Sequence, residues 1–547
     1  MQGLMQDWPL TLDKVLDFAA QTHPNRAIVS RDGQGQIRRI GYGQLHARAK
    51  TISRALLHHG IGLGDRIGTL AWNHSEHLAI WYGIYGIGAV VHTLNPRLLP
   101  DQIAWIINHA GDSLLFVDAG FLPILRAIAP KLETVQRIIV LGGEGDGQLE
   151  GLPNGQSLEA FLAGHEGQVQ WGGFPESTAA GLCYTSGTTG NPKGVLYSHR
   201  SNILHALGAN QGDAFGLRSR DVVLMIVPMF HANAWALTTV CPMAGASLVL
   251  PGPKLDGASI FELLETEKVT LTAAVPTVWL SLLQYLKQTQ QRPSTLKRVV
   301  IGGSAVPEAI LRAFEEDYGI EVIHAWGMTE MSPMGTMCTL GPEEENLDSE
   351  SRIRLKLKQG RAPFLVEIKI VGDEGQILPH DGKTFGRLQV RGPAVARAYF
   401  RGDGARRNDG TALEEDGFFD TGDVATIDPS GMMQITDRAK DVIKSGGEWI
   451  SSIEIENIAL GAAGVANAAV IGIAHPKWDE RPLLIIEPLQ PDAITKEAVL
   501  RFLDGKIAKF WMPDEVVFVE KIPLGATGKI NKMALRQQFE HFTLPSA

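Results

Sequence analysis

Short apolar runs alternate with stretches of helical periodicity along the N-terminal part of the chain, and this alternation restricts the fold more than any other feature. Apolar residues recur at helical spacing over 10–22 and 42–59. Apolar runs of strand length lie at 66–71, 90–94, 114–117 and 137–141. Because strands separated by helices form βαβ units, the pattern predicts an α/β fold built on a parallel sheet.

Length and charge limit the class of protein further. A chain of 547 residues with 44% hydrophobic content exceeds one hydrophobic core, so we expect two or more domains. A formal charge of −10 argues against nonspecific nucleic-acid binding, which needs a basic surface. The three cysteines are far apart and form no disulfide framework or metal-ligand spacing, which fits a reducing cytosol.

No segment resembles a membrane or export signal. Residues 1–15 lack a basic region followed by an apolar run, so no secretory signal is expected. The most apolar run, 78–91, is too short to cross a membrane. It predicts a buried helix that leads into a strand.

The segment 182–200, LCYTSGTTGNPKGVLYSHR, is the strongest candidate for a binding loop. Small hydroxyl residues and glycines at 185–190 can direct several N–H groups at one anion, and Lys193 adds a positive charge. The P-loop of nucleotide hydrolases is disfavoured, because Pro192 precedes the lysine and Gly194 follows it. Alone, such a cluster is also typical of a polar surface loop.

Further candidates follow predicted strands, where open α/β sheets bind their ligands. Residues 229–235 bring His231 and Trp235 to the end of one apolar run, although a histidine there is also compatible with a plain core position. Residues 302–305 are small enough for a flat base to approach. Glu330, two residues after Met328, could bind Mg²⁺ beside the aromatic ring of Trp326.

The second half contains a different pattern. Alternating residues at 366–371 and 385–390 predict antiparallel strands of a small β subdomain, and Asp423 is expected in a tight turn. Residues 341–361 are charged and poorly periodic, so we expect an exposed connection. Four charges at 437–441 indicate an exposed junction between domains.

Together these motifs resemble the adenylate-forming superfamily, which contains acyl-CoA synthetases, luciferases and peptide-synthetase adenylation domains. The continuation Glu448-Trp449-Ile450-Ser451-Ser452 is especially similar to medium- and long-chain fatty acyl-CoA ligases. The resemblance covers roughly residues 10–540. It departs from the family at Trp326, where a tyrosine is usual, at Ala325, often a glycine, and at Gly525, which replaces a common hydroxyl residue.

The resemblance implies a fold and a domain division. We expect a large N-terminal domain, 1–437, made of parallel-sheet αβαβα layers with a β subdomain at about 362–437. A small α+β C-terminal domain, 438–547, would move about a hinge near Lys440.

The resemblance also assigns roles. It implies Lys529, Lys193, Glu330 and Lys444 as catalytic residues, with Thr185 and Glu330 as the Mg²⁺ ligands. The implied ATP and AMP site comprises Thr185, Ser186, Gly187, Thr188, Thr189, Gly190, Gly303, Ser304, Ala325, Trp326, Gly327, Met328, Thr329, Asp423, Ile435 and Arg438. The implied acyl pocket comprises His231, Trp235 as its gate, Val275 and Pro276. The implied thioester-forming segment comprises Lys444, Gly446, Gly447, Glu448 and Trp449.

The expected enzyme is therefore an acid–thiol ligase that uses ATP, CoA and Mg²⁺. It would convert a carboxylic acid to an acyl-AMP and then to an acyl-CoA, with medium-chain fatty acids as the central expectation. Long-chain acids, 3-methylthiopropionate and aryl acids stay open as substrates. A nucleotide-binding regulator without turnover is the alternative class. A cytoplasmic homodimer is expected from the subgroup.

Overall fold

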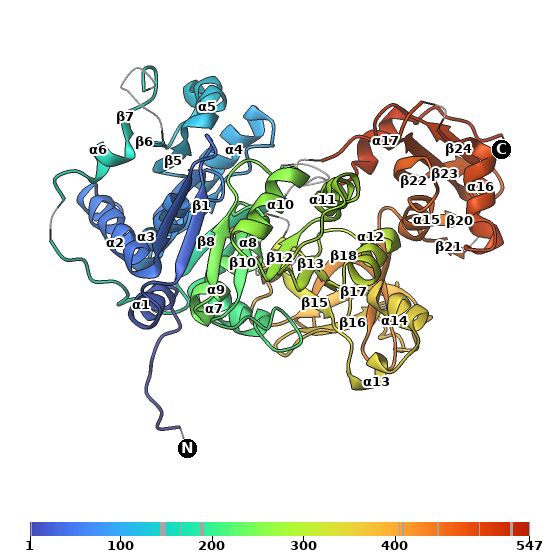
Figure 1. Cartoon of the computed structure of the whole chain (residues 1–547), viewed down its shortest axis with the longest axis horizontal. Helices are drawn as coiled ribbons and strands as arrows, with labels where there is room; N and C mark the ends of the chain where they lie inside the picture. Colours follow the sequence, from blue (N-terminus) through green and yellow to red (C-terminus); the bar gives the residue numbers. More distant parts are fainter. Residues whose placement is uncertain are drawn as a thin grey trace.

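The computed structural model describes residues 1, 3–142, 149–165, 167–185, 191–403, 405–406, 410–445, 448–491, 493–525 and 529–545, with only the backbone of 448–449. Figure 1 shows a large body that carries the N-terminus and a separate smaller lobe that carries the C-terminus. Four β-sheets organise these two parts.

A seven-stranded sheet begins the large body, in the order β7-β6-β5-β3-β4-β8-β9. Its strands are parallel except for the pair β8–β9. Their bounds are β3 Arg66–Leu70, β4 Val90–Thr93, β5 Leu114–Asp118, β6 Arg137–Leu141, β7 Gly155–Ser157, β8 Ala179–Thr185 and β9 Lys193–Ser198. Most of these short apolar strands are buried, as expected for a sheet covered on both faces.

An eight-stranded sheet lies beside it, in the order β15-β14-β13-β12-β10-β11-β1-β2, and only its two end pairs are antiparallel. Its bounds are β1 Ala27–Arg31, β2 Ile37–Gly41, β10 Val222–Leu224, β11 Ser247–Leu250, β12 Leu271–Ala274, β13 Arg298–Ile301, β14 Glu321–Gly327 and β15 Met334–Cys338. One apolar core draws residues from both large sheets. The alternation of apolar runs and helices correctly predicted the parallel strands β3, β4, β5 and β6 of the seven-stranded sheet.

Helices cover the two large sheets (Figure 1). Their bounds are α1 Asp13–Thr22, α2 Tyr42–His58, α3 Ser75–Gly86, α4 Pro100–Ala110, α5 Leu122–Ile128, α6 Leu158–Leu162, α7 His199–Ala209, α8 Ala232–Trp235, α9 Leu237–Ala244, α10 Gly257–Thr266, α11 Pro276–Thr289 and α12 Glu308–Arg312. Helix α3 is buried along its length and leads to β4, as predicted for 78–91.

The side chain of Asn73 ties the two large sheets together. Its Nδ2 donates to the carbonyl oxygens of Met225 and Val227, both at 2.8 Å, and its Oδ1 accepts from the N–H of Met229 at 2.8 Å. Asn73 is 3% exposed, so these bonds satisfy a buried amide and the backbone beyond β10. They fix the segment that continues to His231 and Trp235.

A four-stranded antiparallel sheet follows, in the order β16-β17-β18-β19, as the alternating pattern predicted. Its bounds are β16 Glu367–Val371, β17 Gly386–Arg391, β18 Phe419–Ile427 and β19 Met433–Arg438. Two helices precede it, α13 Pro342–Glu345 and α14 Ser349–Lys356. The connection expected at 341–361 is mostly exposed over 341–350, as predicted, but it is helical and buries Ile353 and Lys356. Asp348 caps α14 by accepting from the N–H of Ser351 at 2.9 Å.

The smaller lobe is built on a five-stranded sheet, β21-β20-β23-β22 with β24 beside β23. Its bounds are β20 Ile443–Ser445, β21 Glu448–Ile450, β22 Val465–His475, β23 Asp479–Pro488, β24 Glu515–Phe518, α15 Ser452–Ala459, α16 Lys496–Leu503 and α17 Lys532–Gln538. The predicted fold class is thereby confirmed: a large α/β part with a small β-sheet, followed by a smaller α+β part.

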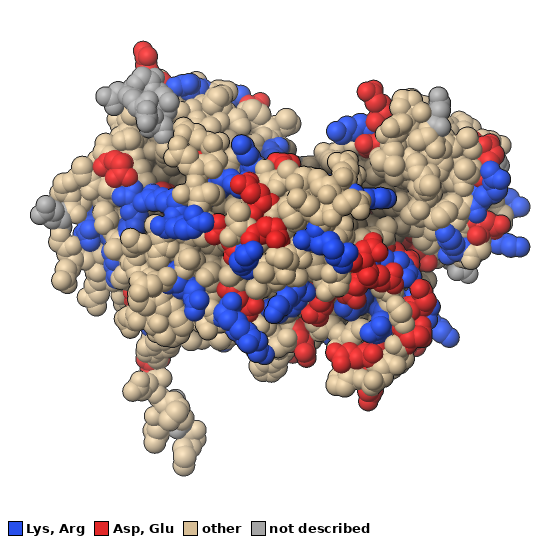
Figure 2. Space-filling view, in the orientation of Figure 1, with Lys and Arg blue, Asp and Glu red and all other residues tan. Residues whose placement is uncertain are grey.

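Two surface observations complete the fold. On the face shown in Figure 2, basic and acidic side chains are interspersed and form no broad basic area. Among the described residues, no helix combines the length and apolar character that a membrane span requires.

Candidate active site

Strand ends from both large sheets meet around one cavity of about 640 Å³. The carboxyl ends of β4, β8, β12, β13 and β14 all reach it, which is where α/β sheets place ligands. Of the predicted residues, the cavity is lined by Thr185, Lys193, His231, Trp235, Val275, Gly303, Ala325, Trp326, Gly327, Met328, Thr329, Glu330, Arg438, Lys440 and Lys529. Residues more than 340 positions apart thus share one site.

Other predicted residues do not line this cavity. They are Pro276, Ser304, Asp423, Ile435 and Lys444. Ser186, Gly187, Thr188, Thr189, Gly190, Gly446 and Gly447 lie outside the described residues, as do the side chains of Glu448 and Trp449.

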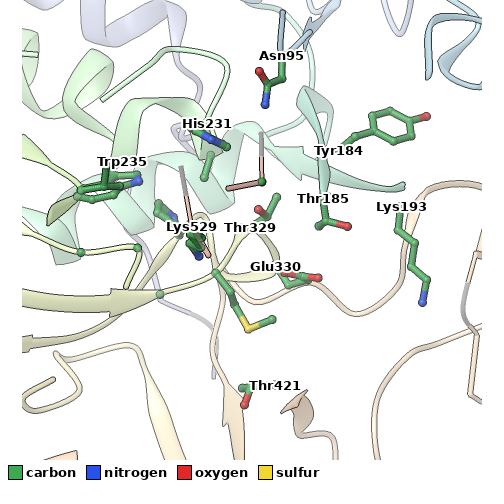
Figure 3. Close-up of a pocket in the computed structure, with 18 of the residues that line it drawn as sticks. Asn95, Tyr184, Thr185, Lys193, His231, Trp235, Thr329, Glu330, Thr421 and Lys529 are labelled. Atoms are coloured by element: carbon green, nitrogen blue, oxygen red, sulfur yellow. The ribbon is translucent and has the colours of Figure 1, made fainter. Parts of the chain in front are cut away.

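Glu330 is the first of two buried carboxylates at the site. It follows β14 and is 7% exposed. Its Oε1 accepts a hydrogen bond from the Tyr399 hydroxyl at 2.7 Å, and its backbone carbonyl accepts from the N–H of Ala396 at 2.7 Å. No nitrogen of a Lys, Arg or His in the described part of the chain pairs with its carboxylate. Thr185 and Glu330 both point into the cavity in Figure 3.

Lys193 begins β9, directly opposite Thr185 in the β8–β9 ladder. This antiparallel pairing places Thr185 and Lys193 side by side. The Lys193 ammonium lies 5.0 Å from the centre of the Tyr399 ring, a cation–π distance. In Figure 3, Lys193 and Trp235 lie on opposite sides of the cavity.

Asp423 is the second buried carboxylate and is 3% exposed. It lies inside β18, not in the tight turn that the sequence suggested. Its Oδ2 accepts from the indole N–H of Trp326 at 2.9 Å, and its Oδ1 pairs with Arg438 Nε at 2.7 Å. Burial raises the pKa of Asp423, while Arg438 and then the Trp326 bond lower it.

The position of the Trp326 ring is fixed by the surrounding protein. Its ring packs against the apolar core of the four-stranded sheet, and it lies so close to Gly335 that a Cβ there would fall 2.3 Å from a ring carbon. The indole is held by its N–H and by packing at once. The aromatic residue predicted beside the adenine site is thus also a partner of Asp423.

The segment leading to Trp235 is strained. Five consecutive non-glycine residues, 232–236, have φ between 38° and 67°, the left-handed region that L-residues avoid. The Trp235 ring lies against Gly302, where a Cβ would fall 3.2 Å from the ring and 2.9 Å from the Ala325 carbonyl oxygen. Only glycine fits there. Strain of this kind is typical of functional sites.

His231 precedes that turn. Its Nε2 is buried and has no hydrogen-bond partner among the described residues. Burial first, then the positive charges of Lys529 and Arg97, lower the pKa of His231 to about 4. The imidazole at the cavity wall is therefore neutral at physiological pH.

Lys529 comes from the smaller lobe and enters the cavity of the larger body. Its Cε lies 3.9 Å from the position that a Cβ on Gly303 would occupy. The carbonyl oxygen of Lys529 accepts from the N–H of Gly525 at 2.7 Å. The side chain faces open cavity space but has protein around it. Burial, followed by the charge of Arg438, lowers the pKa of Lys529 to about 8, whereas the charges of Asp423 and Glu330 raise it.

The junction between the two parts is only partly exposed. Arg438 and Lys440 are exposed, whereas Asp437 is 1% and Asp441 is 9% exposed. The Oδ2 of Asp437 accepts from the N–H and hydroxyl of Ser452 at 2.7 and 2.6 Å. The expectation that all four charges are exposed was wrong for these two aspartates, since backbone and hydroxyl donors satisfy one and Arg536 pairs with the other at 2.7 Å.

Comparison with protein families identifies the chain. The model for an AMP-binding enzyme matches residues 16–400, and that for an AMP-binding enzyme C-terminal domain matches 454–529. The chain belongs to the adenylate-forming family of AMP-binding enzymes. The predicted family is confirmed.

Relatives of this adenylate-forming enzyme agree. The chain is 47% identical to the 3-methylmercaptopropionyl-CoA ligase of Ruegeria lacuscaerulensis, over 99% of both chains. It is 43% identical to the medium-chain-fatty-acid–CoA ligase of Ectopseudomonas oleovorans, over 100% of this chain and 99% of that one. The ATP-bound structure of MatB from Rhodopseudomonas palustris superposes with a TM-score of 0.80 at 25% identity, covering 97% and 99% of the two chains. The predicted enzyme class, an acyl-CoA ligase, is confirmed.

Several cavity residues were not predicted from the sequence of this adenylate-forming enzyme. They include Asn95, Tyr184, Thr421 and Tyr399. Tyr184 lies in β8 directly before the predicted Thr185, and Asn95 lies two residues after the end of β4, so their positions at strand ends could have indicated them. Nothing in the local sequence marks Tyr399, because its partners Glu330 and Lys193 are remote in the chain.

Proposed function

We propose that this acyl-CoA ligase activates an apolar carboxylic acid of medium chain length with ATP and transfers the acyl group to CoA. The observation that carries the proposal is the entry of Lys529 into a cavity that also holds Glu330, Thr185 and Lys193. Two basic and one acidic side chain from distant segments suit a polyphosphate substrate beside an apolar acid.

The geometry supports a first step at the α-phosphate. The substrate carboxylate would attack the α-phosphorus of ATP, and the bond to the bridging oxygen of pyrophosphate would break. Negative charge grows on the leaving pyrophosphate, and preorganised positive groups lower that barrier. We assign this role to Lys529 and Lys193. Arg438, which pairs with Asp423, would contact the nucleotide. Asp423 would accept hydrogen bonds from the ribose hydroxyls.

The residues at Glu330 fit a magnesium ion. A buried carboxylate without a cationic partner among the described residues is costly unless a cation joins it. No set of three or more His, Cys, Asp or Glu within the described residues could hold a metal alone, so ATP oxygens would complete the shell. Glu330 and Thr185 would hold Mg²⁺, which supplies charge neutralisation at the phosphates.

Apolar and sulfur-containing side chains also line the cavity. They include Phe215, Phe230, Trp235, Val275, Met334 and Met337. Such walls suit an alkyl chain, so medium-chain fatty acids remain the central proposal. A thioether acid is the second candidate, because the 47% identical relative is named for one and methionine sulfur packs well on aromatic rings. Long-chain and aryl acids are outcomes of the substrate test.

The second half-reaction needs a different arrangement. Lys444 is exposed on β20 and does not line the cavity, whereas Lys529 does. One small lobe cannot present both to the same point. We propose that residues 438–547 form a mobile domain that rotates at Lys440 after pyrophosphate leaves, so that the segment 444–449 faces the acyl-AMP for attack by the CoA thiol.

Separate assays of the two half-reactions test this proposal. Lys529→Ala should reduce pyrophosphate release by at least about 100-fold, as expected for loss of one preorganised cation. Its thioester synthesis from supplied acyl-adenylate should remain. Gly447→Trp should give the converse result. A wild-type protein that releases no pyrophosphate with any acid would favour the nucleotide-binding regulator, and equal loss of both half-reactions in Lys529→Ala would exclude the division of labour.

We also propose that the protein is cytoplasmic and forms a homodimer. The three cysteines are buried and free, which suits a reducing cytoplasm. A homodimer is proposed from the subgroup that the sequence resembles. Cell fractionation and light scattering of the purified protein test these two points.

A further inference from the structure

Tyr399 contacts two oppositely charged groups of the site, Glu330 and Lys193. Its hydroxyl donates to Glu330 Oε1 at 2.7 Å, and its ring faces the Lys193 ammonium at 5.0 Å. Tyr399 also lines the cavity and directly precedes the turn Phe400–Gly402. One side chain therefore contacts both the carboxylate and the ammonium.

The tyrosine itself is held firmly. Its ring packs beside the apolar cluster of Cys183, Val195 and Tyr197, and lies 6.2 Å from the ring of Phe419. Burial first, then the Glu330 charge, raises the pKa of Tyr399, so the hydroxyl stays protonated and can only donate to the carboxylate. The phenol is a fixed, neutral donor.

A neutral donor has a specific consequence for Glu330. An ammonium in its place would form an ion pair and neutralise the carboxylate, leaving little attraction for a divalent cation. Tyr399 instead orients one oxygen and leaves the other without a partner from the described part of the chain. No ion pair joins Lys193 to Glu330 in this structure, although both line the same cavity.

We propose that Tyr399 is a positioning residue that keeps Lys193 and Glu330 apart, so that Glu330 stays free for the divalent cation and Lys193 for the ATP phosphates. This inference rests on the proposed roles of Glu330 and Lys193. The hydroxyl orients the carboxylate, and the ring gives the ammonium a resting position by cation–π attraction. ATP, with its larger negative charge, then draws the lysine off the ring.

Two variants separate the hydroxyl from the ring. Tyr399→Phe loses the hydrogen bond but keeps the ring between the two charges. Tyr399→Leu loses both, and under this proposal Lys193 should then pair with Glu330. We expect the Mn²⁺ concentration for half-saturation, measured by electron paramagnetic resonance with a non-hydrolysable ATP analogue, to rise about threefold in Tyr399→Phe and about tenfold in Tyr399→Leu.

A double variant tests the separation directly. In Tyr399→Leu with Lys193→Met no ammonium is left to neutralise Glu330, so half-saturation should return to within about threefold of the wild-type value. Tyr197→Phe is the matched control, because the Tyr197 hydroxyl donates to the neighbouring Thr329 carbonyl at 2.7 Å and does not touch Glu330. It should change thermal stability without changing Mn²⁺ binding.

The outcomes are distinct. Unchanged Mn²⁺ binding in both Tyr399 variants overturns the inference, while continued AMP formation keeps the proposed function. A double variant no better than Tyr399→Leu overturns the separation of charges. A wild-type protein that neither binds Mn²⁺ with the ATP analogue nor forms AMP removes the proposed function and this inference together.

Discussion

Two buried carboxylates, one that lines the cavity and one bonded to the lining residues Trp326 and Arg438, are held in opposite ways. Asp423 has a donor on each oxygen, the Trp326 indole at 2.9 Å and Arg438 at 2.7 Å. Glu330 has one neutral donor, the Tyr399 hydroxyl, and no cationic partner in the described chain. Their exposures, 3% and 7%, are similar, so burial does not distinguish them.

The difference indicates which ligand each carboxylate suits. A carboxylate with its charge already balanced can accept hydrogen bonds from neutral hydroxyls without a further cation. An unbalanced buried carboxylate gains most from a metal ion. The pattern of partners, more than residue type or burial, therefore supports Asp423 at the ribose and Glu330 at the cation.

The largest expected effect comes from neutralising each carboxylate in turn. Glu330→Gln keeps an acceptor for Tyr399 but removes the charge, so kcat/KM for AMP formation should fall at least about 100-fold. Asp423→Asn should raise KM for ATP about tenfold, since one charge-assisted contact is lost. Pyrophosphate release at varied ATP measures both.

The stability of the fold should change in opposite directions in the two variants Glu330→Gln and Asp423→Asn. Glu330→Gln removes an unpaired buried charge and should raise the unfolding temperature. Asp423→Asn leaves Arg438, which is about half exposed, without its partner and should cost about 1 kcal/mol. Calorimetry of the two variants checks the signs. Equal changes in both would show that the two carboxylates are not distinguished by their partners.

The adenylation rate should also depend on pH, and this effect is expected to be smaller. It arises from the pKa of Lys529, on which both carboxylates act. The lysine pKa is lowered to about 8, first by burial and then by Arg438, while Asp423 and Glu330 oppose the shift. The charged amine is present below that pKa and is lost as pH rises through it. In the adenylation half-reaction, kcat/KM for ATP should therefore fall about tenfold per pH unit above 8.

The thioester half-reaction provides the internal control for this pH dependence. Its nucleophile is the CoA thiolate, whose fraction grows as pH rises toward the thiol pKa, so that rate should increase where adenylation declines. In Glu330→Gln and Asp423→Asn, one of the groups that raise the Lys529 pKa is gone, so the alkaline limb should move to lower pH. Parallel pH profiles in both half-reactions would contradict the assignment of Lys529 to adenylation alone.

The sequence predicted the parts of the site that lie in one continuous motif. Lys193, Glu330 and Lys529 each belong to a recognisable string, and all three line the cavity. Strand ends could be read from apolar runs followed by glycine or polar residues. The catalytic role of Lys529 was inferred only from resemblance, and its position near Gly303 was not predicted, because no local pattern shows how two parts of a chain dock.

Features that depend on remote partners could not be predicted. Residues 341–361 form two helices because Asp348 caps one and Ile353 packs into the core, neither of which the charge pattern indicates. Asp423 follows glycine, which suggested a turn, yet ladder bonds with β19 keep it in a strand. Tyr399 contacts Lys193 and Glu330 only because the fold brings β9 and the turn after β14 to it.

The smallest expected effect concerns Trp326, the departure from the usual tyrosine. Its N–H supplies the weaker of the two contacts to Asp423, and Gly335 leaves room for its ring. Trp326→Phe should raise KM for ATP about threefold to fivefold with kcat unchanged, the size of one net hydrogen bond. Combined with Asp423→Asn, it should add little, since the partner charge is already gone. Full additivity in this cycle, measured as AMP formation, would mean that Trp326 acts through packing against the adenine and not through Asp423. The contrast between the two carboxylates would then rest on Arg438 alone.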